Sequence, residues 1–134
     1  MTKRAVESAN VASTKGPYAQ GIEVTRAKLV FTSGVVARDA GGTILGKGDT
    51  RAQTRQCIEN IRHIIEAAGG SLSDLVKVTV FLRDLKDYEG MNEARREMLG
   101  GIAFASSTVQ AGLNAADAMV EIEAVAAVPV EAER

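Results

Sequence analysis

The chain has 134 residues and a mass of 14.1 kDa, which corresponds to a single domain, 1–134. Its 46% apolar and 25% charged residues are ordinary for a globular protein, and a formal net charge of −1 gives no general attraction to nucleic acid or to an anionic membrane. One cysteine and one histidine exclude Cys/His zinc patterns and an internal disulfide, and no metal or other cofactor is expected. The N-terminal residues lack the apolar core of a signal peptide, and no run approaches ~18 apolar residues, so we expect a soluble, cytoplasmic protein.

The first half of the chain predicts two strands and one long helix. Residues 21–24 and 27–34 are typical of strands, the second of which ends at a glycine. Residues 38–48 are rich in glycine and aspartate and predict a loop or an irregular hairpin. Asp49 offers an N-cap for a helix over 50–68, which two glycines then end. The apolar positions of this helix form one stripe at helical spacing: Thr54, Cys57, Ile58, Ile61, Ile64, Ile65 and Ala68.

The second half predicts three further strands around a second helix. Residues 75–82 form a strong strand pattern, a turn follows, and residues 88–99 predict a helix closed by two glycines. Residues 104–110 and 118–128 are typical of the last two strands, and the charged end at 131–134 is expected to fray. The order β-β-α-β-α-β-β indicates an α+β fold, in which a mixed β-sheet carries two helices on one face.

Neither the cysteine nor the histidine has a setting that favours catalysis. Cys57 lies on the apolar stripe without a nearby activating base, so packing is favoured over nucleophilic chemistry. His63 falls off that stripe among Glu59, Arg62 and Glu66, as expected for a solvated surface side chain. The carboxylates are therefore the better candidates for a functional group.

The last predicted strand carries two acids inside an apolar run, MVEIEAVAAV. Alternation along a strand places Glu121 and Glu123 on one face, roughly 7 Å apart. That face also carries Met119, Val125 and Ala127, so it is not simply a solvated face. Because two helices can cover only one face of the sheet, an apolar second face predicts self-association, with these acids at or near a subunit boundary.

Several short motifs occur in the order and spacing of one known family. They are Gly16-Pro17-Tyr18, Phe31-Thr32-Ser33-Gly34, the 52–68 helix, Val78-Thr79-Val80-Phe81-Leu82, Met91-Asn92 and Val120-Glu121-Ile122-Glu123-Ala124. From about Gly16 to Ala126 the chain resembles the RidA family, also called YjgF/YER/UK or endoribonuclease L-PSP proteins. The resemblance implies a chorismate-mutase-like α+β subunit and a homotrimer whose three sheets form a central barrel, with clefts between subunits.

The resemblance also implies a chemistry for these clefts. The best-known members hydrolyse reactive enamines and imines, such as 2-aminoacrylate, to a 2-keto acid and ammonia. In those members a tyrosine, a serine, an asparagine, an arginine and a glutamate line the cleft. Motif by motif, the matching positions here are Tyr18, Ser33, Asn92 and Glu121.

The arginine is the position that differs. The family places it in a Pro-x-Arg run entering the penultimate strand, where it holds the substrate carboxylate. Here Phe104 stands at the place of the proline and Ser106 at the place of the arginine, so the chain resembles an arginine-lacking member. A serine hydroxyl cannot reproduce a bidentate, charge-assisted grip, and its loss should weaken binding of a small amino-acid imine by about tenfold or more. Efficient deamination of 2-aminoacrylate is therefore not expected.

Glu121 is the expected catalytic residue. The expected substrate-binding residues are Tyr18, Ser33, Asn92 and Ser106. In a closed cleft the Glu121 carboxylate would lose hydration, exchange protons near neutral pH and steer a water onto a C=N or C=O carbon. The alternative for Glu121 is an interface ion pair, and Glu123 is expected to be structural, satisfied by a basic group in the trimer. A core ring stays an alternative for Tyr18, and a helix N-cap for Asn92.

Two classes of function stay open. The first is a hydrolase or deaminase that acts on a C–N bond of a small reactive metabolite at an intersubunit cleft. The second is a non-catalytic metabolite-binding or protein-interacting trimer, which the missing arginine favours. One family name suggests ribonuclease activity. This sequence, however, has no stripe of basic and aromatic residues of the kind that binds nucleic acid. The 51–55 segment and its helix also resemble the 2-aminomuconate deaminase and RutC branches, which generally keep the arginine.

Overall fold

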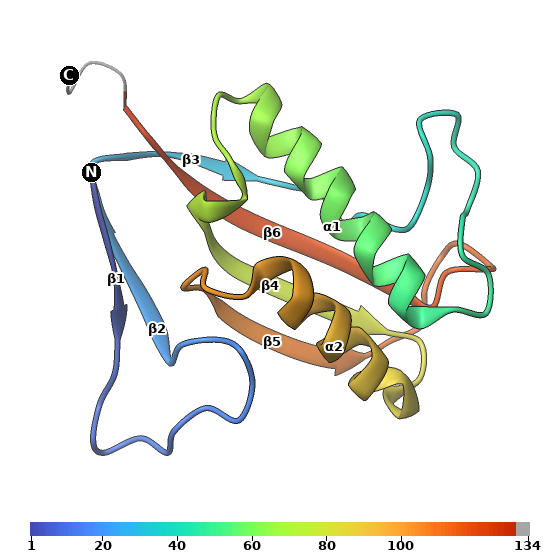
Figure 1. Cartoon of the computed structure of the whole chain (residues 1–134), viewed down its shortest axis with the longest axis horizontal. Coiled ribbons are helices and arrows are strands. Elements are labelled where there is room, and N and C mark those ends of the chain that lie inside the picture. Colours follow the sequence, from blue (N-terminus) through green and yellow to red (C-terminus); the bar gives the residue numbers. More distant parts are fainter. Residues whose placement is uncertain (131–134) are drawn as a thin grey trace.

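The computed structural model describes residues 1–130, so the charged end predicted at 131–134 lies outside the described residues. The strands are β1 Thr2–Val6, β2 Gly21–Thr25, β3 Ala27–Phe31, β4 Leu75–Leu82, β5 Ala105–Gln110 and β6 Val120–Pro129 (Figure 1). The helices are α1 Thr50–Ala67 and α2 Tyr88–Leu99. A short 3₁₀ turn, η1 Leu72–Asp74, follows α1, and a second, η2 Leu85–Asp87, precedes α2.

Four strands form the main sheet, in the order β3-β6-β4-β5. β6 runs antiparallel to both β3 and β4, while β4 and β5 are parallel, so the sheet is mixed as predicted. β1 was not predicted from the sequence. Within residues 1–130 it pairs only with β2, and this two-stranded sheet stands apart from the two helices, on the left of Figure 1.

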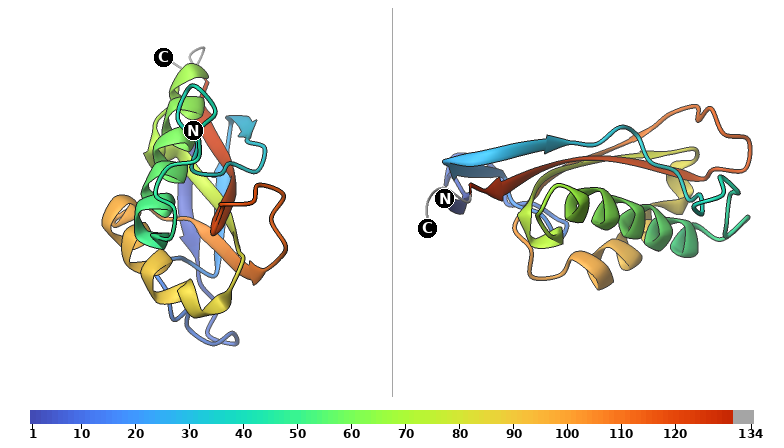
Figure 2. Two further views of the ribbon diagram at one scale, coloured as in Figure 1. Left: turned by 90° about the vertical axis from the view of Figure 1, so that its right-hand side faces the viewer. Right: turned by 90° about the horizontal axis from the view of Figure 1, so that it is seen from above.

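Both helices cover the same face of the main sheet, which confirms the predicted α+β arrangement (Figure 2). Every second residue of β6 is buried under them because strand side chains alternate between the two faces. The buried core lies between this strand face and the apolar stripe of α1, where Cys57, Ile58, Ile61 and Ile65 are enclosed. Burial of each such aliphatic side chain contributes roughly 1.5–3 kcal/mol to folding.

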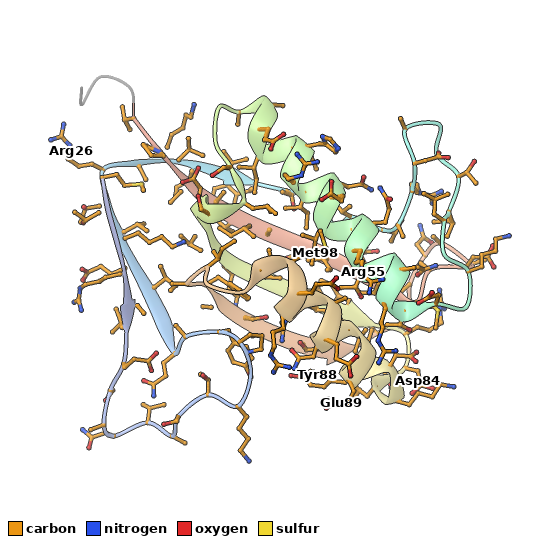
Figure 3. All side chains as sticks on the ribbon, viewed as in Figure 1. Arg26, Arg55, Asp84, Tyr88, Glu89 and Met98 are labelled. Atoms are coloured by element: carbon orange, nitrogen blue, oxygen red, sulfur yellow. The ribbon has the colours of Figure 1, made fainter. Side chains whose placement is uncertain are left out.

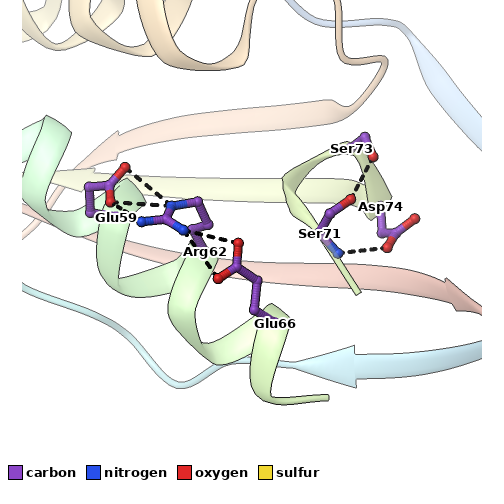
Figure 4. Close-up of polar contacts among 6 residues, drawn as sticks. All are labelled: Glu59, Arg62, Glu66, Ser71, Ser73 and Asp74. Atoms are coloured by element: carbon purple, nitrogen blue, oxygen red, sulfur yellow. Dashed lines mark hydrogen bonds and ion pairs between the residues drawn. The ribbon is translucent and has the colours of Figure 1, made fainter. Parts of the chain in front are cut away.

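The ends of α1 follow from local side-chain chemistry. The Asp49 side chain accepts a hydrogen bond from the Ala52 backbone N–H at 3.0 Å, which confirms the predicted N-cap. Gly69, which follows the helix, has φ +88°, a left-handed conformation that favours glycine. In the segment after it, Ser71 donates its backbone N–H to the Asp74 carboxylate, which begins η1 (Figure 4).

Arginines of α1 form ion pairs with carboxylates at the surface of the helices. Arg62 bridges Glu59 and Glu66 along α1 with N–O distances of 2.6 and 3.0 Å (Figure 4). Arg55 reaches from α1 to Glu97 on α2, and Figure 3 shows Arg55 between the two helices. These pairs are partly exposed, so each is expected to contribute at most ~1 kcal/mol.

The face of the sheet opposite the helices has no covering element in the described part of the chain (Figure 2). Phe31 pairs in register with Val125 and is 70% exposed, and its neighbour on the same face, Leu29, is 51% exposed. Val109 of β5 adds a further exposed apolar side chain. Such an apolar surface is typical of a contact with another protein chain.

Candidate functional site

Three elements bring a group of polar side chains together at the β5 edge of the sheet, here called the Arg95 cluster: Tyr18, Asn92, Arg95 and Ser106. Asn92 and Arg95 lie three residues apart on α2 and therefore share one helix face. The Arg95 guanidinium donates through Nη1 to Ser106 Oγ at 2.7 Å and through Nη2 to Asn92 Oδ1 at 2.9 Å. Its Cζ lies 5.4 Å from the centre of the Tyr18 ring, a cation–π distance.

Local backbone contacts fix the Tyr18 side of this cluster. Tyr18 donates its N–H to the Gly16 carbonyl at 2.8 Å, and Ala19 donates to the Phe104 carbonyl at the entrance to β5. A Cβ at position 16 would overlap the Tyr18 ring, so the turn requires the glycine there. The Tyr18 ring also packs against the apolar core. It is therefore both a core ring, as in the alternative considered above, and a member of the Arg95 cluster.

Arg95 is the most unusual member of the cluster because its charge is enclosed. Its exposed fraction is 0%, and Nε has no hydrogen-bond partner within residues 1–130. Burial lowers the pKa of this guanidinium, while interactions with Tyr88 and Tyr18 act in the opposite direction. Tyr88 lies at the start of α2 (Figure 3).

The sequence analysis missed Arg95 and considered a different role for Asn92. α2 begins at Tyr88 after Asp87, so Asn92 lies inside the helix, and the N-cap alternative is wrong. Asn92 is instead buried with its side-chain oxygen on Arg95. Ser106, which the sequence analysis expected at the place of the family arginine, accepts a hydrogen bond from a guanidinium of α2.

A second group lies where β3 ends beside β6, here called the Glu121 cluster: Ser33, Gly34 and Glu121. The Glu121 carboxylate lies directly against Gly34, where a Cβ would overlap it. Backbone hydrogen bonds between Val35 and Ile122 hold the 33–35 segment beside β6. Glu121 forms no ion pair with any side chain within residues 1–130.

The two clusters do not meet within one chain. Ser106 faces the helices, as its contact with Arg95 requires, whereas Glu121 alternates with the buried Val120 and Ile122 and faces the other side. Ser33 and Ser106 are separated by three strand spacings, which is about 14 Å at the usual spacing of ~4.8 Å. A single protomer therefore cannot place both clusters on one small molecule.

The remaining candidate side chains belong to neither cluster. Glu123 is exposed on the open face, in register with Thr79. Cys57 is buried, and burial, with a smaller effect of the Glu121 charge, raises the pKa of its thiol to about 12, which confirms the packing role. His63 is exposed, as predicted, and lines a cavity together with Gly34 of the Glu121 cluster.

The described residues contain no group of metal-ligating side chains and no membrane-spanning helix. Within residues 1–130, no three His, Cys, Asp or Glu side chains are grouped closely enough to hold a metal ion. None of the helices in this part of the chain has the length and apolar character needed to cross a bilayer.

Comparison with known proteins gives consistent matches over nearly the full length. A family model described as Endoribonuclease L-PSP matches residues 8–128. A RutC family protein of Pyrococcus horikoshii is 39% identical over 92% of this chain and 97% of its own length. The 3-aminoacrylate deaminase RutC of Acinetobacter baylyi is 39% identical over 84% of this chain and 90% of its own.

Solved structures match in the same way. A conserved Rid-family protein of Yersinia pestis covers 96% of this chain and 100% of its own with a TM-score of 0.84, and at 22% identity it supports the fold alone. The crystal structure of E. coli TdcF with bound serine is 34% identical, covers 92% of this chain and 98% of its own, and has a TM-score of 0.68.

Proposed function

Because this chain belongs to the endoribonuclease L-PSP family, we propose that it is a hydrolase or deaminase acting on a small reactive enamine, imine or related C=N or C=O compound. The observation that carries the proposal is the position of the Glu121 carboxylate, which faces the open side of the sheet with no ion-pair partner in residues 1–130. A carboxylate in that state is available to accept a proton.

The relatives support this class of substrate. RutC of A. baylyi is named as a 3-aminoacrylate deaminase, and TdcF of E. coli binds serine in its crystal structure. Both compounds are small molecules that carry a nitrogen and a carboxylate. A substrate of the same size and polarity is the simplest expectation for this chain.

The active cleft lies between subunits of a homotrimer. The open sheet face exposes apolar side chains such as Phe31, and its burial would supply the driving force for association. Contact between open faces brings the Glu121 cluster of one subunit towards the edge of the next, where the Arg95 cluster lies. The separation of the two clusters within one chain supports such a shared cleft.

The reaction consists of water addition to a C=N bond. Glu121 accepts a proton from the water as its oxygen bonds to the imine carbon, and passes that proton to the nitrogen as the C=N π bond breaks. In the resulting amino alcohol, Glu121 then accepts the hydroxyl proton as the C=O bond forms. It passes this proton to the nitrogen as the C–N bond breaks, so that ammonia leaves and the carboxylate is regenerated.

The serine at position 106 sets a limit on the substrate. Its hydroxyl cannot replace a strand arginine as a bidentate carboxylate ligand, and the Arg95 guanidinium behind it is enclosed in the protomer. Turnover of 2-aminoacrylate is therefore expected to be inefficient compared with a relative that has the strand arginine.

Paired substitutions on one strand test the catalytic role. Glu121→Gln keeps the shape but cannot accept a proton, so turnover of 2-aminoacrylate or 3-aminoacrylate should be abolished while the fold and assembly persist. Glu123→Gln, on the same face, is the matched control and should keep its activity and change mainly the thermal stability. If both variants keep wild-type turnover, the catalytic role of Glu121 is wrong. If the wild-type protein binds such metabolites without turnover, the non-catalytic binding trimer is the correct class.

A further inference from the structure

Arg95 has a combination of properties that a purely structural arginine rarely has. It is fully buried, and its polar partners in residues 1–130 are Asn92, Ser106 and Tyr88, none of which is a carboxylate. A buried charge is costly unless an opposite charge or a full set of hydrogen bonds compensates it, and Nε has neither within residues 1–130.

Other arginines of the same helices show the contrast. Arg51, Arg55 and Arg62 are a third or more exposed, and each is paired with a glutamate. Solvent would stabilise these charges without a partner, whereas Arg95 has no access to solvent. Arg95 therefore has a greater need for an anion than these three arginines, and residues 1–130 supply none.

We propose that Arg95 is an anion-binding residue that takes the carboxylate of a small metabolite, and that Ser106 and Asn92 position its guanidinium for this role. This inference rests on the proposed function for the identity of the cleft, but not for the binding itself. The unpartnered Nε–H and the planar guanidinium suit a carboxylate, which forms charge-assisted hydrogen bonds with such a group.

The half-buried Tyr18 ring lies against the guanidinium, with 5.4 Å between Cζ and the ring centre. A ligand therefore reaches Arg95 by a rotation of the Tyr18 side chain, while the backbone hydrogen bonds of Tyr18 and Ala19 hold the segment itself in place. A carboxylate fits better than a phosphate, because one negative charge matches the single cation of the Arg95 cluster and a second charge would be buried without a partner.

Tyrosine fluorescence provides a direct measurement of binding. The chain has no tryptophan, and its two tyrosines, Tyr18 and Tyr88, both interact with Arg95. Titration with pyruvate should change the fluorescence, and the neutral analogue pyruvamide should bind at least about tenfold more weakly, since a charge-assisted hydrogen bond is lost. Inorganic phosphate should give a weaker response than pyruvate. Equal responses to pyruvate and pyruvamide would overturn the proposal.

Substitutions assign the binding to this side chain. Arg95→Met should weaken pyruvate binding by roughly tenfold to a hundredfold, whereas Arg96→Met, at an exposed arginine next to it on α2, should leave binding unchanged. In the Arg95→Met background, Ser106→Arg supplies a guanidinium from the strand and should restore binding, which separates the loss of the charge from a loss of folding. Unchanged binding in Arg95→Met, or equal weakening in Arg96→Met, would contradict the assignment.

The glutamate variant separates this inference from the proposed function. Glu121→Gln should bind pyruvate as the wild-type protein does, because the binding depends on Arg95. Pyruvate binding that depends on Arg95 in a protein without turnover would contradict the hydrolase but support the anion site. Turnover that depends on Glu121 with unchanged binding in Arg95→Met would contradict the anion site alone.

Discussion

Gly34 lies directly against the carboxylate of Glu121, and a Cβ at position 34 would overlap that carboxylate. Gly34→Ala should therefore displace the Glu121 side chain while leaving the core intact, because Gly34 is exposed. We expect kcat to fall roughly tenfold to a hundredfold, as for other small displacements of a catalytic group. Steady-state kinetics and a thermal unfolding curve measure the two effects.

Gly112→Ala is the matched control for this substitution. A Cβ at position 112 meets no atom within 4 Å, and the residue is exposed. This variant should keep wild-type kinetics and stability. If Gly34→Ala is as active as Gly112→Ala, the carboxylate does not need its observed position.

The open face of the sheet predicts the oligomeric state. Light scattering at micromolar concentration should give three times the chain mass of 14.1 kDa. Phe31→Glu places a charge on the exposed apolar face and should give monomers, while Leu85→Glu, at a 50% exposed position on η2, should stay trimeric. A wild-type protein that is monomeric would remove the basis for a shared cleft.

Activity on 2-aminoacrylate should be low. With the enamine generated in situ by a dehydratase, its decay in the presence of this protein should be slower than with a relative that carries the strand arginine. The physical reason is that Arg95 must be uncovered from Tyr18 before it can bind the carboxylate. Rates equal to those of the relative would show that Arg95 replaces the strand arginine without this cost.

The thiol of Cys57 predicts how stability depends on pH. Burial raises its pKa from 9.0 to about 12, so the folded state keeps a proton that the unfolded state loses above about pH 9. The contribution of the protonated thiol to the free energy of unfolding is fully present below pH 9. Between pH 9 and 12 the free energy of unfolding falls by ~1.4 kcal/mol per pH unit. Urea unfolding from pH 9 to pH 11 should therefore show a steeper loss for the wild-type protein than for Cys57→Ala. Equal slopes would indicate that the thiol ionises in the folded state.

The sequence predicted those elements whose pattern is local. α1 was predictable because Asp49 caps it and its apolar stripe repeats at helical spacing. β1 was missed because its side chains are mostly exposed and it pairs only with β2, so no alternation of apolar residues marks it.

The candidate site was predictable only in part. Family motifs indicated Tyr18, Asn92 and Ser106, and the structure brings these three together around Arg95. Arg95 was missed because a charged residue in a helix usually faces solvent, and its burial depends on tertiary packing. The available signal was its spacing of three residues from Asn92, on the apolar side of α2.

A shared cleft is the central claim, and subunit mixing tests it most directly. Glu121→Gln and Asn92→Ala alter different clusters, so each homotrimer should be inactive on the enamine that the wild-type protein hydrolyses. After refolding of an equal mixture, subunits assemble at random. Roughly a quarter of the clefts should then combine an intact Glu121 from one subunit with an intact Asn92 from its neighbour. The account predicts recovery of about that fraction of wild-type activity. No recovery from a mixture of well-folded trimers would contradict it.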